Sequence, residues 1–207
     1  MRGRLITLEG GEGAGKSTLL RGLEAHLRAQ GVDLVVTREP GGTDVGEAVR
    51  AVVLDATNNE LCAEAELLLM FASRAQLVRQ VIEPALAAGR WVLCDRFTDA
   101  SFAYQGGGRG QPVERIEALE AWAALGLKPD ITLLLDLPVS TGRARAAGRG
   151  EADRIEVLTA EGPRHAFVLA TNVYHRTPLG WRMVAHHASP GSSHEPGDTG
   201  EVPQVLH

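Results

Sequence analysis

The sequence predicts an α/β fold with three layers, in which helices cover both faces of a parallel sheet. Four short runs are apolar almost without interruption, as is typical of strands that are buried on both faces. Stretches with helical spacing separate these runs, and strands that alternate with helices form right-handed βαβ units. The length of 207 residues, with 44% hydrophobic and 23% charged residues, suits a chain built around one main domain.

The elements follow in chain order from the apolar runs and the spacing between them. The predicted strands are Leu5–Glu9, Leu34–Thr37, Trp91–Asp95 and Ile131–Asp136. After the first strand, leucines recur on one helical face as far as Gly31, a common helix stop. A long helix is predicted from about Glu60 to Leu86 and another from Pro112 to Leu125. Ligands bind beyond the carboxyl ends of the strands in such sheets, so the residues that follow each strand are candidates for a site.

Composition and charge exclude some classes of protein. The net charge of −5 argues against a general nucleic-acid binder, which usually has a broad basic surface. The apolar stretch at the N-terminus is too short for a signal-peptide core, and no later run approaches a membrane span. We therefore expect a cytoplasmic protein without a membrane partner. Cys62 and Cys94 show no metal-ligand spacing, and we expect both to be buried free thiols.

The strongest motif follows the first strand. Residues 10–17 match the pattern G-x-x-x-x-G-K-[ST] between a strand and a helix, so the fold is expected to be of the P-loop nucleotide-binding type. Glycines let successive N–H groups point at phosphate oxygens, and the helix adds its positive dipole end. Lys16 would neutralise the β- and γ-phosphates, and the Ser17 hydroxyl would bind Mg²⁺. The residues expected to contact the ATP phosphates are Gly10, Gly11, Glu12, Gly13, Ala14, Gly15, Lys16, Ser17 and Thr18.

This loop does not identify the phosphoryl acceptor, because motors, GTPases and DNA-processing ATPases share it. A glycine-rich turn in an unrelated α/β protein is the weaker alternative, since the full pattern lies in the expected context. Five further segments carry the acceptor side: residues 38–43, 68–76, 95–97, 103–109 and 149–156. Together with the loop, these segments closely resemble bacterial thymidylate (dTMP) kinases, in the same order and over residues 4 to 156.

The resemblance implies phosphoryl transfer from ATP to dTMP, with dTDP and ADP as products. It also implies a homodimer that forms through the long helices. Arg38 and Arg96 follow neighbouring strands, where two guanidinium groups can bind the acceptor's 5′-phosphate; a surface salt bridge is the alternative for each. Asp95 ends a buried strand and is expected to hold Mg²⁺ directly or through water.

The resemblance also assigns residues to the base and sugar of dTMP. Phe71 and Arg74 share a helical face, and the family places such a ring and guanidinium against thymine. Without the resemblance, Phe71 would be read as a core residue. The remaining assigned positions contact the base edge, crowd the sugar, or belong to the run typical of thymidylate kinases: Ser101, Tyr104 and Gln105. Glu12 resembles the family's acidic residue near the acceptor sugar, with an exposed loop carboxylate as the alternative.

Three arginines follow the fourth strand among small residues, and this segment resembles a lid over residues 140–154: Arg143, Arg145 and Arg149. Thymidylate kinases carry a basic residue either in the phosphate loop or in the lid. Glu12 and Ala14 leave this loop without an arginine, so the lid is expected to supply the charge, with Arg149 as the first choice. A solvated basic face is the alternative. The expected catalytic set is Lys16, Arg149, Asp95 and Glu12.

The family pattern ends after Glu156. Histidine, proline, serine and glycine become frequent there, and we expect residues 1–156 to form the kinase core and residues 157–207 to be poorly ordered. One hypothesis is that the final segment is translated from another reading frame; another is that it has diverged entirely. Three alternatives to a dTMP kinase stay open: another nucleoside monophosphate kinase, a P-loop switch or motor ATPase, and an inactive nucleotide-binding remnant.

Overall fold

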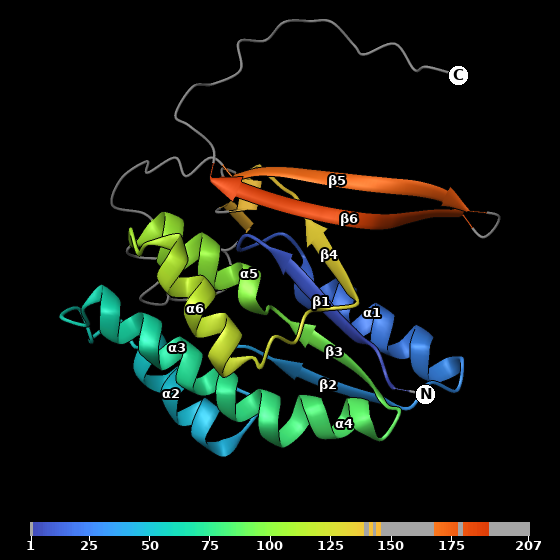
Figure 1. Ribbon diagram of the computed structural model, residues 1–207, viewed down its shortest axis with the longest axis horizontal. Helices are drawn as coiled ribbons and strands as arrows, with labels where there is room; N and C mark the ends of the chain where they lie inside the picture. The colour runs from blue at the N-terminus through green and yellow to red at the C-terminus, as the bar shows by residue number, and fades with distance from the viewer. Residues whose placement is uncertain (1, 139–140, 143, 146–167, 178–179, 191–207) are drawn as a thin grey trace, which may run out of the picture. The chain divides into compact units, whose positions relative to one another are not determined.

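The computed structural model describes residues 2–138, 141–142, 144–145, 168–177 and 180–190. The chain divides into two compact units, Met1–Arg164 and His165–His207. The first unit contains a four-stranded parallel sheet with the strand order β2-β3-β1-β4 and helices on both faces (Figure 1). The strands are β1 (Leu5–Gly10), β2 (Leu34–Arg38), β3 (Trp91–Asp95) and β4 (Ile131–Leu135). The predicted α/β class with a parallel sheet is confirmed.

Strand register brings the polar strand ends together. Asp95 of β3 lies opposite Leu8 of β1 and opposite Arg38 of β2. Gly10 ends β1 beside the last residue of β4. The phosphate loop, Arg38 and Asp95 therefore lie together at the carboxyl ends of the strands, where ligands bind in parallel α/β sheets.

The two faces of the sheet are covered by different helices. Side chains alternate along β1, so Ile6 and Leu8 pack with the leucines of α1 (Lys16–Ala29). Leu5 points to the opposite face, where it joins a buried cluster formed largely by the π-helical segment η1 (Val78–Ile82) and α4 (Glu83–Ala87). A third cluster links α3 (Ala63–Leu77) to α6 (Val113–Ala123).

The long helix predicted from about Glu60 to Leu86 runs instead from 63 to 87 through three segments: α3, η1 and α4. Pro84 lies near the start of α4, directly after the π-helical turn. Proline has no N–H to donate and its ring crowds the carbonyl of the preceding turn, so a locally wider helix accommodates it. The helix predicted from Pro112 to Leu125 is confirmed as α6.

Two helical regions were not predicted. The first is α2 (Asp44–Leu54), which begins where the Thr43 Oγ1 accepts a hydrogen bond from the Gly46 N–H. The second comprises α5 (Thr98–Ser101) and the π-helical segment η2 (Phe102–Gly108). Glycine has a low helix propensity, so the three glycines at the end of η2 hide the helical segment from a prediction based on propensity.

The second unit contains an antiparallel pair, β5 (Val168–Thr177) and β6 (Gly180–Pro190), with a register shift between Val173 and Tyr174. The remaining positions of the segment 157–207, for which we expected poor order, lie outside the described residues. Within the described part of the chain, no helix has the length and apolar character to cross a membrane. Cys94 is buried as expected, but the expectation was wrong for Cys62, which is exposed at the N-cap position of α3.

Candidate active site

The phosphate loop joins β1 to α1, as its sequence predicts. Gly13 and Gly15 have φ values of 72° and 98°, in the left-handed region that side chains with a Cβ avoid. The Lys16 side chain folds back over the loop, and its Nζ donates to the carbonyl oxygens of Gly10 (2.8 Å) and Gly11 (2.9 Å). Burial lowers the pKa of Lys16, and the positive charge of Arg96 lowers it further. The loop therefore holds its cation close to the backbone that would surround a phosphate.

A cavity of about 260 Å³ opens between the phosphate loop and the ends of β2 and β3. Ser17 and Thr18 are part of its wall. Its charged lining comprises four cations (Lys16, Arg38, Arg50 and Arg96) and three carboxylates (Glu12, Glu39 and Asp95). Four cations around one small cavity are suited to binding phosphate groups.

Arg96 occupies the centre of this cluster. Its NH1 donates to the Gly10 carbonyl (3.2 Å), and its NH2 donates to Glu12 Oε1 (3.2 Å) and to the Tyr104 hydroxyl (3.1 Å). The guanidinium carbon also lies 5.0 Å from the centre of the Tyr104 ring. The structure thus brings together three residues that the sequence analysis assigned separately: Glu12, Arg96 and Tyr104.

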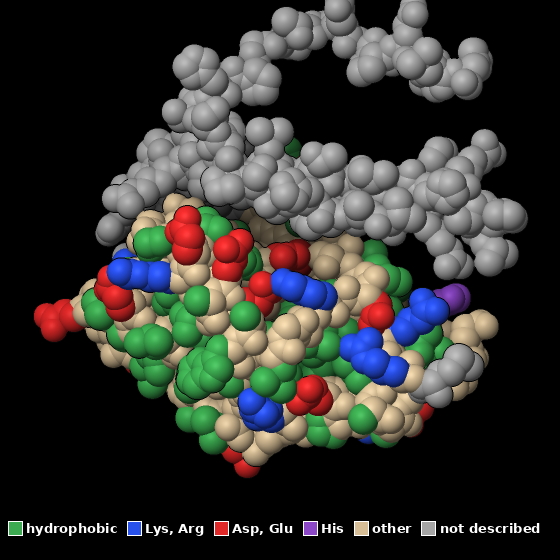
Figure 2. All heavy atoms as spheres, in the orientation of Figure 1, with side chains coloured by type: hydrophobic (Ala, Val, Ile, Leu, Met, Phe, Trp, Pro, Cys, Tyr) green, Lys and Arg blue, Asp and Glu red, His purple; other side chains and the backbone are tan. Residues whose placement is uncertain are grey.

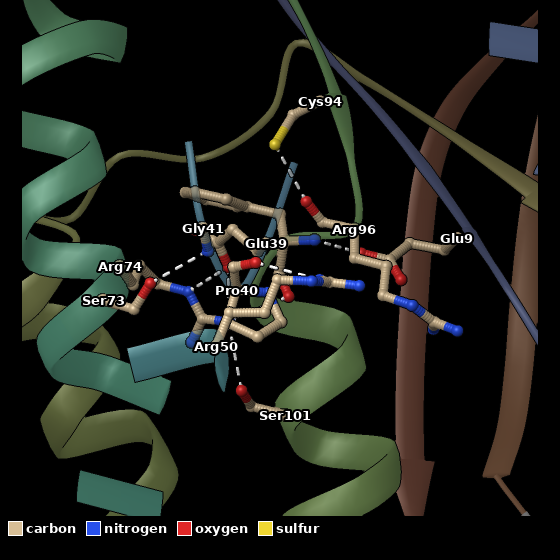
Figure 3. Close-up of polar contacts among 11 residues, drawn as sticks. Glu9, Glu39, Pro40, Gly41, Arg50, Ser73, Arg74, Cys94, Arg96 and Ser101 are labelled. Carbon is tan, nitrogen blue, oxygen red and sulfur yellow. Dashed lines mark hydrogen bonds and ion pairs between the residues drawn. The ribbon is translucent and has the colours of Figure 1, made fainter. Parts of the chain in front are cut away.

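Arg38 and Arg50 reach the cavity from β2 and α2. Arg38 NH2 donates to Glu47 Oε2 (2.9 Å), while Glu47 Oε1 accepts from the Gly42 N–H (2.8 Å). These bonds lower the pKa of Glu47. Arg50 NH1 donates to the Pro40 carbonyl (3.0 Å), and Figure 3 shows it below the Glu39–Pro40 turn. Sequence reasoning missed Arg50; the capping residue Thr43, two helical turns earlier, was the signal that could have revealed it.

Arg74 is fully buried and is held on two sides (Figure 3). Its Nε donates to Glu39 Oε2 (2.7 Å), and its NH2 donates to the Phe97 carbonyl and to Ser101 Oγ, both at 3.1 Å. The Phe71 ring centre lies 4.4 Å from the guanidinium carbon. Phe71, Arg74 and Ser101 are therefore neighbours, and Phe71 also belongs to a core cluster.

The pair formed by Glu39 and Arg74 carries unused hydrogen-bonding atoms. Glu39 Oε1 and Arg74 NH1 are buried and have no hydrogen-bond partner among the described residues. Burial raises the pKa of Glu39, and the Arg74 guanidinium beside it lowers that pKa in part. Glu39 was not among the predicted site residues, because its burial depends on a partner on another element.

Gln105 also has a buried acidic partner that the sequence analysis missed. Its Nε2 donates to Glu66 Oε1 (2.9 Å), and Arg109 Nε lies 3.3 Å from Glu66 Oε2. The Gln105 Oε1 is buried without a hydrogen-bond partner in the described part of the chain. Glu66 thus orients the Gln105 amide and leaves its oxygen available.

The residues predicted to hold Mg²⁺ suit that ion. Asp95 and Ser17 line the same cavity, and Asp95 Oδ1 is buried with no hydrogen bond to any described residue. Carboxylate and hydroxyl oxygens are the hard ligands that Mg²⁺ prefers. The described residues contain no cluster of three His, Cys, Asp or Glu side chains able to hold a metal. Mg²⁺ at nucleotide sites usually binds one or two protein carboxylates, and substrate phosphates and water are its other ligands.

The segment predicted to form a lid is only partly described. Arg145 is exposed, whereas Arg143 and Arg149 lie outside the described residues. Gly142 lies directly against the phosphate loop: a Cβ at Gly13 would collide with the Gly142 carbonyl, and a Cβ at Gly142 would collide with the Glu12 carbonyl. The chain after β4 therefore returns to the loop at the position expected for the base of a lid.

Comparisons with known proteins agree with this geometry. The family profile described as "Thymidylate kinase" matches residues 8–161. The thymidylate kinase of Ectopseudomonas mendocina (strain ymp) is 59% identical over 156 residues, which are 75% of this chain and 74% of the relative. That of Pseudomonas putida (strain GB-1) is 60% identical with the same coverage. That of Alkalilimnicola ehrlichii is 59% identical over 75% of this chain and 72% of the relative.

The matched range contains every residue that the sequence analysis assigned to the site, from Gly10 to Arg149. It also contains the four parallel strands and the cavity beyond their ends. The chain belongs to the thymidylate kinase family, the ATP-dependent kinases that phosphorylate dTMP to dTDP.

Proposed function

We propose that the chain performs this reaction at the 260 Å³ cavity, with the loop side binding ATP and the arginine side binding dTMP. The observation that carries the proposal is the convergence of Lys16 with Arg38, Arg50 and Arg96 around one cavity. A P-loop switch or motor protein binds one nucleotide and has no need for three arginines opposite the loop.

The chemistry requires alignment and charge neutralisation rather than a general base, because the attacking oxygen of dTMP is already anionic. Lys16 and the loop amides hold the β- and γ-phosphates, while Arg38 and Arg96 hold the acceptor phosphate in line. Ser17 and Asp95 would hold Mg²⁺, which would supply positive charge to neutralise the phosphate oxygens. Arg149 would approach from the lid; a transition-state arginine contributes about 10³–10⁵ in rate.

We assign the acceptor base to the surroundings of Arg74, which bonds to Glu39 in the wall of the cavity. Arg74 NH1 has two N–H groups without a described partner, and a base carbonyl would satisfy them. Ser101 and Gln105 supply polar contacts, Phe71 packs beside the base, and Tyr104 crowds the sugar. Glu12 is assigned to the sugar side of the acceptor because it bonds to Arg96 at the mouth of the cavity.

We also propose a homodimer in the cytoplasm. Large apolar side chains remain exposed on three helices that pack together: Val45 and Val52 on α2, Leu68 on α3 and Trp122 on α6. Figure 2 shows hydrophobic side chains among the charged ones on this layer of helices. A second copy of the chain would cover such a surface.

The deciding experiment measures ADP release from ATP and Mg²⁺ with dTMP, dUMP, CMP or AMP as acceptor. We expect a clear preference for dTMP and a loss of about 10²-fold or more in kcat for Lys16→Ala. Arg28→Ala, an exposed position on the same helix, is the matched control and should retain activity. Turnover that survives in Lys16→Ala, or no turnover with any acceptor, would contradict the proposal.

A further inference from the structure

Glu9 is a buried carboxylate beside the phosphate loop for which the proposed reaction has no use. It is the last residue of β1 before Gly10, and its side chain is only 4% exposed. Its Oε1 accepts a hydrogen bond of 2.6 Å from the backbone N–H of Phe97. This bond joins the end of β1 to the segment after β3, next to Arg96 (Figure 3).

Arg96 has a backbone conformation that needs external support. Its φ of 70° lies in the left-handed region, which is unfavourable for a residue with a Cβ. Such conformations persist where surrounding bonds over-determine them, and they cluster at functional sites. Two bonds from β1 enclose this residue: the Arg96 N–H donates to the Leu8 carbonyl (2.9 Å), and the next N–H donates to Glu9. A third bond runs from Cys94 Sγ to the Arg96 carbonyl (3.0 Å).

The surroundings of Glu9 do not explain its burial as a stabilising ion pair. Arg96 attracts the carboxylate, but Asp99 and Glu39 also face it and oppose its negative charge. Burial, with Asp99 next in importance, raises the pKa of Glu9 to about 7. The Phe97 N–H lowers the pKa of Glu9 in part, because it bonds the carboxylate more strongly than the neutral carboxyl. A carboxyl group still has an oxygen that can accept this N–H in either protonation state.

We propose that Glu9 is a positioning residue for the acceptor phosphate. Its Oε1 holds the Phe97 amide and thereby fixes Arg96 in the left-handed conformation that directs the guanidinium into the cavity. The inference rests on the proposed function, in which Arg96 binds the 5′-phosphate of dTMP. A purely structural role for Glu9 would alter stability without altering the binding of one substrate in particular.

The test compares the steady-state kinetics of the full-length chain with those of three variants. Glu9→Ala removes the carboxyl oxygen that accepts the hydrogen bond from the Phe97 N–H. We expect the KM for dTMP to rise roughly tenfold or more while the KM for ATP stays unchanged. Glu9→Gln keeps an amide oxygen for the Phe97 N–H, and it should restore a KM near that of the parent. Glu9→Asp draws the carboxylate back by one bond, and should raise the KM for dTMP even if the alanine variant fails to fold.

Asp130→Ala is the matched control. Asp130 Oδ2 accepts from the Leu5 N–H (2.7 Å) at the opposite end of the same strand. Its loss should lower thermal stability without changing the KM for dTMP. An unchanged KM for dTMP in Glu9→Asp and in any folded Glu9→Ala, or no rescue by Glu9→Gln, would overturn the inference.

Arg96→Met separates this inference from the function on which it rests. If Arg96→Met raises the KM for dTMP and the Glu9 variants do not, only the role of Glu9 is wrong. If Arg96→Met also leaves that KM unchanged, the proposed phosphate contact fails and the inference fails with it.

Discussion

The buried pair of Glu39 and Arg74 has features that stability alone does not explain. Taking both charges out of water is costly, and each partner still has an atom without a hydrogen bond among the described residues. A pair kept only for stability would have every polar atom satisfied. The unused NH1 of Arg74 is instead available to a ligand, and Glu39 fixes the guanidinium that presents it.

Glu39→Gln tests this reading. The substitution removes the negative charge and leaves Arg74 buried without a counter-charge, so we expect a loss of about 3 kcal/mol in the free energy of unfolding. We also expect a higher KM for dTMP. Urea denaturation and steady-state kinetics measure the two effects. Glu47→Gln breaks the half-exposed pair with Arg38 and should cost less than about 1 kcal/mol. Equal losses in the two variants would contradict the prediction.

Glu9 makes stability depend on pH in a defined direction. Its pKa in the folded state is about 7, against 4.5 when unfolded, so the folded state favours the protonated form. Its contribution to stability is fully present below pH about 4.5 and is lost as the pH rises through about 7. Urea denaturation of the parent and of Glu9→Gln, without nucleotide and with chelator, should show this loss only in the parent. A pKa shift of this size corresponds to about 3 kcal/mol in the free energy of unfolding. If the difference in this free energy between the parent and Glu9→Gln stays constant from pH 4.5 to 8, the prediction is wrong.

At the scale of elements, the chain after β4 packs directly against the phosphate loop. Gly142 and the phosphate loop approach so closely that neither Gly13 nor Gly142 has room for a Cβ. Close packing of Gly142 against the phosphate loop is therefore part of the fold of this region. The lid that the sequence predicts over residues 140–154 would therefore begin beside the phosphate loop.

Gly142→Ala should disturb this approach. The added Cβ would meet the Glu12 carbonyl, so either the lid base or the loop must shift. We expect kcat to fall roughly tenfold or more, since small displacements of catalytic groups cost up to about 10²-fold. Gly22→Ala, at a position in α1 with open space around it, is the control and should retain activity. Kinetics of Gly142→Ala that match those of Gly22→Ala would show that the contact is unimportant.

Elements differ in how far the sequence reveals them. The four strands and the phosphate loop were predicted because their signals are local: apolar runs and glycine spacing. The helix α2, and with it Arg50, was missed because Thr43 was taken only as the last residue of the acceptor-side segment 38–43 and not as a helix cap. Glu9, Glu39 and Glu66 were missed for another reason. The role of each carboxylate depends on a partner 35 or more positions away in the chain (Phe97, Arg74 and Gln105), which no local pattern encodes.

For the whole molecule, family membership and structural division agree closely. The family match ends at residue 161, and the first compact unit ends at Arg164. Within the described residues, β4 forms the edge of the parallel sheet, with Ile131 and Leu134 exposed on it. All cations of the candidate site that are described, and the cavity they line, belong to the first unit.

The proposed homodimer is a prediction about the whole molecule. Light scattering should give twice the 22.1 kDa mass of the chain. Leu68 is 58% exposed on α3, and Leu68→Glu would place a charge within the proposed interface, so we expect this variant to be monomeric. Leu134→Glu changes a residue that is 46% exposed on β4, outside the layer of helices, and should leave the dimer intact. A monomeric parent chain would disprove the dimer, and a dimeric Leu68→Glu would place its interface elsewhere.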